Sequence, residues 1–424
     1  MSRLAAWYDA HRGPRTIVIG WLSTRLLILV ILAAFERFVV GDVFYYYRKI
    51  NALFTAGLDR TLYEYPTPVV WILWLPYGAS LGSRVGYLVA FVVFILALDA
   101  VFCYALWRAS GRRHDSAVDF WLIFVPLIGP LAYLRFDMLP AVLAGGALLA
   151  ARRKPWVTGA LTGLGAAIKL WPALLIGAFL SYQSDRRPAG IAFIVVGFGL
   201  ALISLIFGGW SRLISPLTWQ SDRGLQIESI WATPLMLARA ARPNQWIINI
   251  SRYQAYEIFG PGVDAWVMIS SIATVLGLSV IILLTVRAFR HDGSTPAAIG
   301  LVVIATVAIM TITNKTLSPQ YLLWVGGPMA ALLAFRPQAT PEEQPAISRI
   351  ARQALVLALL TQLVYPLFYY SYLGHHGHAM IIVSTIVTAL RNLALVVFTV
   401  EVCRLAWRML GAGVTERTAL TRRD

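Results

Sequence analysis

Long runs of apolar residues alternate with short polar turns along almost the whole 424-residue chain. A helix rises about 1.5 Å per residue and needs about 20 apolar residues to cross a bilayer. The pattern therefore predicts an all-α fold: a polytopic membrane helix bundle of about 12 spans that forms a single domain over residues 1–424. The expected membrane helices are 16–35, 84–107, 117–134, 137–151, 155–168, 171–182, 191–207, 266–286, 297–313, 321–335, 354–372 and 379–404.

Clusters of arginine separate many of the apolar runs. Residues 108–113, 152–154 and 186–187 are examples, and the basic N-terminus precedes a first apolar run that lacks a small-residue cleavage site. Positive turns favour the cytoplasmic side, so both termini are expected inside and the first run is expected to be retained as a helix, not removed as a signal peptide. The main extracytoplasmic loops are then 36–83 and 208–264.

Three segments need separate interpretation. The segment 67–81 is short, Pro66 precedes it, and Pro68 and Pro76 lie within it. We therefore expect an interfacial helix on the outer surface instead of a full span. The segments 155–168 and 171–182 are too short to be ordinary spans, and we expect an out-and-back pair with Lys169 near its apex. Half-length helices at membrane depth are tolerated where they line a protein cavity. Residues 337–350 are interpreted as an ordinary cytoplasmic loop.

Composition excludes several classes of protein. Hydrophobic residues make up 58% of the chain and charged residues 13%, whereas globular domains carry about 25% charged residues. The formal net charge of +16 comes mostly from the arginine turns and does not form a binding stripe, so we expect no nucleic-acid partner and a lipid bilayer as the environment. Cys103 and Cys403 lie in apolar segments, which excludes a disulfide framework.

Most conspicuous polar residues outside the arginine turns fall on the outer side of the predicted topology. The apolar spans contain few ionisable residues, chiefly Arg25, Asp99 and Arg391. An ion pathway would distribute charges through the depth of the bundle, so this convergence favours an enzyme over a transporter. The outer polar residues are Asp42, Asp59, Glu64, Arg135, Asp137, Lys169, Gln226, Glu228, Lys315, Gln320, His375, His376 and His378.

Three of these residues have a specific chemical interpretation. Asp42 precedes an aromatic cluster just after the first span, which suits sugar binding and proton transfer from an attacking hydroxyl. The alternative is a helix N-cap beside interfacial aromatics. Lys169 and Lys315 are suited to pairing with a phosphate, or alternatively are lysines that extend to the membrane interface. The histidines at 375–378 lie in a short glycine-containing turn where solvated histidines are expected, so no metal is predicted.

Four short sequence motifs, all on the predicted outer side, occur in an order that resembles a known protein family. They are Asp42 with Tyr45 and Tyr46, then Tyr65 with Pro66 and Pro68, then Ala-Ile-Lys-Leu-Trp-Pro at 167–172, and Leu-Ser-Pro-Gln-Tyr at 317–321. The chain is similar over most of its length to bacterial polyprenol-phosphate-sugar-dependent glycosyltransferases of the C-type superfamily. The resemblance is greatest to the actinobacterial alpha-mannosyltransferases and their arabinofuranosyltransferase relatives.

The resemblance implies an inverting displacement at the outer face of the cell membrane, with no nucleotide cofactor. The donor would be a sugar on polyprenyl phosphate, with mannose expected, and the acceptor a glycolipid or polysaccharide. Asp42 would be the general base, and Lys169, helped by Lys315 or Arg135, would stabilise the departing phosphate. The expected substrate-binding residues are Tyr45, Tyr46, Tyr65, Arg135, Asp137, Lys169, Gln226, Glu228, Ser229, Lys315, Gln320 and Tyr321.

Two positions depart from the family pattern. Gln320 stands where relatives often carry histidine, and it cannot be charged. Arg135, Phe136 and Asp137 replace a Gly-Gln-x-Asn turn, which makes Asp137 a rival or an assistant for the base role. Arabinofuranosyl transfer by the same mechanism, a lipid-linked-precursor transporter or flippase, and a noncatalytic partner in an envelope assembly complex remain alternatives.

Overall fold

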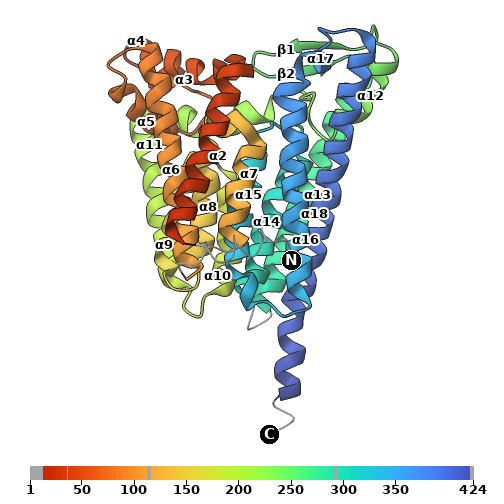
Figure 1. Ribbon diagram of the computed structural model, residues 1–424. Helices are drawn as coiled ribbons and strands as arrows, with labels where there is room; N and C mark the ends of the chain where they lie inside the picture. Colours follow the sequence, from red (N-terminus) through yellow and green to blue (C-terminus); the bar gives the residue numbers. More distant parts are fainter. Residues whose placement is uncertain (1–12, 36, 112–115, 291–294, 421–424) are drawn as a thin grey trace.

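The computed structural model describes residues 13–35, 37–111, 116–290 and 295–420 as a bundle of helices that run between two ends (Figure 1). Within these ranges, seven helices are long and apolar enough to cross a membrane, and three shorter apolar helices accompany them. The predicted all-α, polytopic membrane fold is therefore confirmed. The elements are α2 (Pro14–Phe35), η1 (Arg37–Val40), α3 (Gly41–Asn51), α4 (Leu53–Ala56), η2 (Leu58–Arg60), α5 (Thr67–Ala79), α6 (Arg84–Ala109), α7 (Ser116–Ile128), η3 (Gly129–Ala132), α8 (Met138–Ala150), α9 (Pro155–Ile168), η4 (Trp171–Leu175), α10 (Ile176–Tyr182), α11 (Arg187–Ser221), α12 (Thr233–Ala241), β1 (Ile247–Ile250), β2 (Tyr256–Phe259), α13 (Val263–Arg290), α14 (Pro296–Thr313), α15 (Tyr321–Phe335), η5 (Arg336–Gln338), α16 (Glu343–Gln362), η6 (Leu363–Leu367), α17 (Tyr369–Leu373) and α18 (His378–Leu420).

The two ends of the bundle differ in the elements that they carry. The helices α3, α4, α12 and α17 and the antiparallel hairpin β1–β2 gather at the upper end of Figure 1, which we call the site end. The Tyr47 hydroxyl donates to the Gly82 carbonyl over 2.7 Å and so ties the turn before α6 to α3 at this end. At the opposite end, Arg152 after α8 donates to Gln338 over 3.4 Å. The polar turns are thus sorted between two ends, as the sequence predicts.

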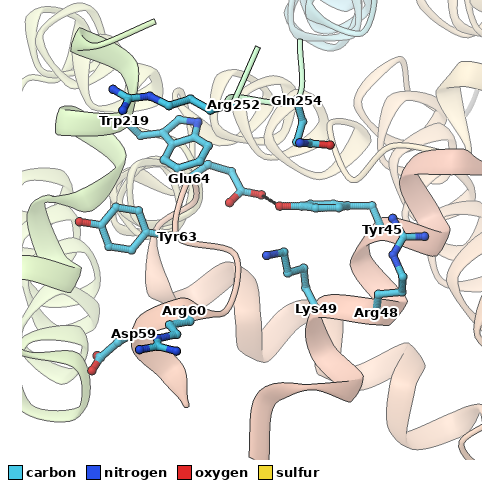
Figure 2. A pocket seen from close by; sticks show the side chains of 10 residues that line it. All are labelled: Tyr45, Arg48, Lys49, Asp59, Arg60, Tyr63, Glu64, Trp219, Arg252 and Gln254. Carbon is cyan, nitrogen blue, oxygen red and sulfur yellow. Dashed lines mark hydrogen bonds between the residues drawn. The ribbon is translucent and has the colours of Figure 1, made fainter. Parts of the chain in front are cut away.

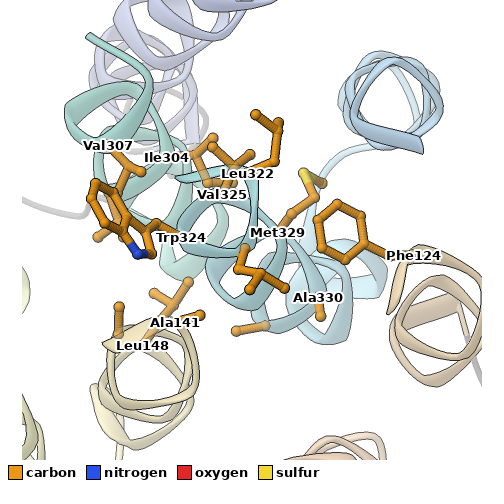
Figure 3. Close-up of a cluster of buried hydrophobic side chains, with 14 of the residues drawn as sticks. Phe124, Ala141, Leu148, Ile304, Val307, Leu322, Trp324, Val325, Met329 and Ala330 are labelled. Carbon is orange, nitrogen blue, oxygen red and sulfur yellow. The ribbon is translucent and has the colours of Figure 1, made fainter. Parts of the chain in front are cut away.

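The core of the bundle lies where α7, α8, α14 and α15 meet (Figure 3). Helix α14 has 83% of its most apolar window buried, whereas α11 has only 6%. Because α11 is equally apolar yet exposed, it presents its side chains to lipid and not to water. Exposed residues such as Ile194, Phe198 and Phe207 on α11 are part of this lipid-facing surface.

Small residues bring α9 close to α11. A Cβ atom on Gly159 would lie 2.0 Å from the Ala189 carbonyl oxygen, and one on Gly163 would lie 2.8 Å from that of Phe193. Only glycine permits this approach, as in other membrane helix pairs with small residues four positions apart. Helix α9 then ends at Ile168, and η4 and α10 complete the return. The predicted half-length pair, with its break at Lys169, is confirmed.

The end of α11 and the start of α16 decide the extent of two predicted loops. The backbone of Gly209 is non-helical, with φ of 71°, a conformation that glycine adopts readily, so a kink divides α11 there and a second helical segment follows up to Ser221. The kink lies directly after the predicted span 191–207, and the segment predicted as a loop from 208 begins with this second helical segment. Residues 343–350 form the first turns of α16, which the charged side chains there obscured. The strands β1 and β2 were not predicted.

Candidate active site

Asp42 and Arg135 form an ion pair at the site end. Asp42 is the second residue of α3, and Arg135 lies in the turn between η3 and α8. Burial alone would lower the pKa of the Arg135 guanidinium, but the Asp42 carboxylate raises that pKa well above its usual value. Arg135 therefore stays cationic. The Asp42 side chain keeps 33% of its surface exposed, so a substrate hydroxyl can reach it.

A second ion pair joins Asp137 to Lys169. Asp137 is buried at the start of α8 and also accepts a 2.9 Å hydrogen bond from the Trp324 indole of α15. The Lys169 ammonium lies 4.5 Å from the Trp324 ring centroid, 5.0 Å from that of Phe136 and 5.5 Å from that of Tyr321. Three aromatic rings around one ammonium fix its position by cation–π attraction. Lys169 is therefore held at a defined point instead of extending freely to the interface.

Phe136 links the two ion pairs. It lies between Arg135 and Asp137 in sequence, and its ring packs against Tyr65 at 5.0 Å and Tyr46 at 6.0 Å. Adjacent residues are only about 3.8 Å apart along the chain, so one short turn presents both charged partners. The structure thus places Asp42, Lys169, Tyr46 and Tyr65 around the same turn. The sequence placed these residues on one side of the bundle but did not predict that this turn brings them together.

Tyr45 faces a cavity of about 550 Å³ at the site end (Figure 2). Its hydroxyl donates to Glu64 over 2.6 Å, and its ring lies 5.6 Å from the Lys49 ammonium. Burial and the neighbouring Glu64 raise the pKa of Tyr45 above its usual value, so it remains a hydrogen-bond donor. The cavity is lined by Tyr45, Arg48, Lys49, Asp59, Arg60, Tyr63, Glu64, Trp219, Arg252 and Gln254.

A second, apolar groove of about 370 Å³ lies beside the Lys169 break. It is formed by the start of α5, the end of α9 and the lipid-facing helix α11. Its lining reaches Leu170, the residue after Lys169. The groove therefore lies between the lipid-facing helix α11 and the α9–η4 break, although the Lys169 side chain is not part of its lining. The lining residues are Pro66, Thr67, Pro68, Ala166, Ala167, Leu170, Phe193, Ile194, Gly197, Phe198, Ala201, Ser204, Leu213 and Pro216.

Gln226, Glu228 and Ser229 lie buried in the loop between α11 and α12. The Arg391 guanidinium of α18 lies 3.8 Å from the Glu228 carboxylate and donates to its backbone carbonyl over 3.0 Å. Burial raises the pKa of Glu228 to about 7, although Arg391 and Arg135 lower it. The Ser229 hydroxyl accepts from the Ala232 amide over 3.1 Å, a local turn contact. Arg135 is thus electrostatically coupled to Glu228 as well as to Asp42.

Lys315, Gln320 and Tyr321 are not equivalent in the structure. The Lys315 ammonium donates to the Ser221 carbonyl over 2.7 Å, and burial lowers its pKa. Gln320 is buried directly before α15, and Tyr321 stacks on Trp324 with ring centroids 4.0 Å apart. The structure therefore brings Tyr321 to Lys169 but bonds Lys315 to the end of α11.

The histidine turn has a local hydrogen bond. His376 Nδ1 lies 2.8 Å from the Ser371 hydroxyl, and His375 is exposed. Within the described ranges, no group of three or more His, Cys, Asp or Glu side chains is arranged to hold a metal ion.

A different charged cluster lies within the spans. Arg25 of α2 donates to both carboxylate oxygens of Asp99 on α6, over 2.8 and 2.9 Å. Trp121 and Tyr133 each donate to Asp99 over 2.6 Å. The carboxylate is fully buried and fully hydrogen-bonded, so this cluster joins α2, α6 and α7 and has no open position for a transported ion.

Comparison with known proteins identifies the family. The model of glycosyltransferase family 87 matches residues 63–312. The chain belongs to glycosyltransferase family 87. This protein is accordingly a multi-pass membrane glycosyltransferase, which confirms the enzyme class that the sequence patches implied. No curated protein matches the chain.

The family 87 match covers much of the candidate site. It includes Arg135, Asp137 and Lys169, and it begins at Tyr63, after Asp42. Sequence reasoning missed four residues of the site: Phe136 as a packing element, Trp324, Glu64 as the Tyr45 partner, and Arg391 as the Glu228 partner. Trp324 lies three positions after Tyr321, on the same face of α15, and this spacing was the available signal.

Proposed function

We propose that this family 87 enzyme transfers a mannosyl residue from polyprenyl phosphate to a hydroxyl of a glycolipid or polysaccharide, at the extracytoplasmic face of the cell membrane. The observation that carries the proposal is the turn at residues 135–137. It contacts Asp42 on one side and Lys169 on the other, next to an apolar groove at the lipid-facing surface.

The groove supports a lipid-linked donor. A polyprenyl chain is apolar, and a groove bounded by the lipid-facing helix α11 can receive it from within the membrane. Its phosphate would then lie near the α9–η4 break, where Lys169 supplies an ammonium that three aromatic rings hold in place. A fixed positive charge at the leaving phosphate stabilises the negative charge that develops there.

Asp42 is better suited than Asp137 to be the general base. Asp137 is buried and occupied by Lys169 and Trp324, whereas a third of the Asp42 side chain is exposed. In the proposed step, the acceptor oxygen attacks the anomeric carbon and its proton passes to Asp42. The bond between that carbon and the phosphate oxygen breaks, and the electron pair leaves with polyprenyl phosphate. Asp137 serves to position Lys169.

A transfer assay in lipid nanodiscs tests the function. Polyprenyl-phosphate-mannose and polyprenyl-phosphate-arabinose are offered as alternative donors with mannoside acceptors. We expect mannosyl transfer with an anomeric configuration opposite to that of the donor. Transfer from the arabinose donor alone would reassign the sugar, and transfer from neither donor would contradict the proposal.

Three variants test the residue roles. Asp42→Asn is expected to lower kcat by roughly 10²–10⁴-fold, the usual contribution of general base catalysis. Asp137→Asn should lower activity less and should weaken the binding of the donor phosphate. Asp264→Asn is the matched control, because Asp264 is an exposed carboxylate in the first turn of α13 outside both cavities. A larger loss for Asp137→Asn than for Asp42→Asn would reverse the two roles.

A further inference from the structure

The cavity beside Tyr45 has an unusual charge for its position. Arg48 and Lys49 of α3, Arg60 of η2 and Arg252 of the β-hairpin turn face it, against only Asp59 and Glu64. The cavity lies at the site end, opposite the arginine-rich turns, so the charge bias that places those turns does not account for this cluster. Cations from three separate segments repel one another unless a negative charge joins them.

Part of the charge in the cavity is already balanced. Glu64 accepts the Tyr45 hydroxyl hydrogen bond, and Lys49 lies over the Tyr45 ring. The Arg252 guanidinium lies 3.9 Å from Asp222, with 75% of its side chain exposed. An ion pair this exposed contributes little. Arg48, Arg60 and Arg252 are therefore able to bind an added anion.

Aromatic rings form the other part of the lining. The Tyr63 and Trp219 rings meet edge to face, with centroids 6.1 Å apart, and Trp219 in turn contacts Tyr253 at 5.0 Å. Figure 2 shows Trp219 and Tyr63 on the same side of the cavity, with the carboxylate of Glu64 nearby. Rigid aromatic faces with a few placed polar groups are typical of binding sites for amphipathic ligands such as sugars.

The proposed base Asp42 and the cavity-lining residue Tyr45 belong to the same helix, α3. Tyr45 lies three positions after Asp42 on α3, so the two side chains share a face of that helix. The part of the cavity wall that Tyr45 forms therefore lies about one helical turn from Asp42.

We propose that this cavity binds the acceptor, and that the acceptor is a glycan carrying a negative charge close to the sugar that is extended. The inference rests on the proposed function, because it uses Asp42 as the base. The sugar packs on Trp219 and Tyr63, its hydroxyls bond to Asp59 and Glu64, and the anionic group pairs with the arginines. The planar guanidinium group of arginine can donate two parallel hydrogen bonds to either a phosphodiester or a carboxylate group.

Binding without any donor tests the inference. Three short mannosides are titrated into the protein in nanodiscs of uncharged lipid, and saturation-transfer NMR measures Kd. The first mannoside is neutral, the second carries a phosphodiester, and the third carries a carboxylate. We expect at least one anionic mannoside to bind about tenfold more tightly than the neutral one, with a preference that declines as salt rises. The better anionic mannoside identifies the acceptor charge.

Variants assign the effect to the cavity. Arg60→Gln with Arg252→Gln should remove the preference for the anionic mannoside, whereas Trp219→Ala should weaken the binding of all three mannosides. Arg242→Gln is the matched control, because Arg242 is an exposed arginine directly after α12, outside the cavity lining. Equal binding of neutral and anionic mannosides, or an unchanged preference in the arginine double variant, would overturn the inference.

The two proposals fail in different ways. Selective binding of an anionic mannoside without transfer from either donor would support this site and contradict the proposed function. Transfer that is equally efficient to neutral and anionic acceptors would support the function and contradict this inference.

Discussion

The charged clusters of this protein are of two kinds, and the pair Arg25–Asp99 and the pair Asp42–Arg135 illustrate the difference. Asp99 is fully buried between the spans, and four hydrogen bonds from three side chains saturate both of its oxygens. Among the described residues, Asp42 has one ion-pair partner, and a third of its side chain is exposed. Saturated buried charges join helices, whereas a charge with an open side can bind a substrate.

The buried pair of Glu228 and Arg391 is less completely hydrogen-bonded than Asp99. Glu228 and Arg391 are buried as deeply as Asp99, yet their closest charged atoms are 3.8 Å apart. Within the described part of the chain, one oxygen of Glu228 and two nitrogens of Arg391 have no hydrogen-bond partner. Buried polar atoms are usually hydrogen-bonded, so this loop retains capacity for a polar ligand or for water. Arg391 belongs to α18, one of the candidate spans, so the transporter alternative is disfavoured by the fully hydrogen-bonded Arg25–Asp99 cluster and not by a general absence of incompletely bonded charge from the spans.

The largest effect is expected for the fully hydrogen-bonded cluster around Asp99. Asp99→Ala leaves the Arg25 guanidinium buried without a counter-charge, and we expect the free energy of unfolding to fall by about 3–5 kcal/mol. Titration with a denaturing detergent measures this free energy. The transfer rate per folded molecule should stay unchanged, and a selective loss of turnover with normal stability would assign Asp99 a functional role.

Lys169→Met is expected to have the next largest effect. It removes the positive charge at the leaving phosphate, and kcat should fall by roughly 10²–10³-fold, as for loss of other donors to a developing anion. Lys169→Arg should restore part of the rate. Lys315→Met is the comparison variant, because Lys315 bonds to Ser221, and an equal loss there would show that Lys315 shares the phosphate.

The raised pKa of Glu228 predicts that the stability of the folded protein depends on pH. Burial raises its folded pKa to about 7 from 4.5, so the folded state binds a proton more tightly than the unfolded state does. The stabilisation is fully present below pH 4.5 and is lost as pH rises through 7, by roughly 2–4 kcal/mol. Hydrogen exchange of the loop between α11 and α12 should follow this curve, and Glu228→Gln should abolish it. An unchanged pH profile in Glu228→Gln would contradict the assignment.

Trp324→Phe is expected to have the smallest effect. It keeps the ring over Lys169 but removes the 2.9 Å hydrogen bond to Asp137. A bond to a charged group contributes about 1.5–3 kcal/mol at most, and Lys169 still holds Asp137, so kcat should fall only several-fold. Steady-state kinetics with saturating donor measure this change. A loss as large as that of Lys169→Met would mean that Trp324 contacts the substrate itself.

The sequence predicted the elements of the fold better than their ends. Apolar length and arginine turns predicted α6 at 84–107, where the structure has Arg84–Ala109, and predicted the break at Lys169. The predicted span 191–207 ends at the kink of Gly209, but the helical segment between this kink and Ser221 was not predictable, because a glycine at a membrane boundary is equally typical of a loop. The helical start of α16 was hidden by its charges, since polar residues carry no burial signal.

The sequence predicted which end of the molecule holds the charged residues of the candidate site, but it did not predict their pairing or the aromatic residues around them. The topology predicted from the arginine-rich turns grouped Asp42, Arg135, Asp137 and Lys169 at one end of the bundle. The structure places them around one turn. The pairing of acids with cations depends on contacts between segments that are distant in sequence. The spacing of residues within one segment does not predict such contacts. The aromatic enclosure of Lys169 by Phe136 and Trp324 likewise arises only when α8, the α9–η4 break and α15 meet.

One measurement compares the two kinds of charge directly. The single-turnover rate constant for mannosyl transfer is determined for Asp42→Asn and Asp99→Asn and normalised to the fraction of folded protein, with the thermal unfolding temperature recorded for each. We predict a loss of at least about 100-fold in rate with only a small decrease in unfolding temperature for Asp42→Asn, whose partner Arg135 is partly exposed. For Asp99→Asn we predict a larger decrease in unfolding temperature with a normal rate. A normal transfer rate in Asp42→Asn would contradict the account.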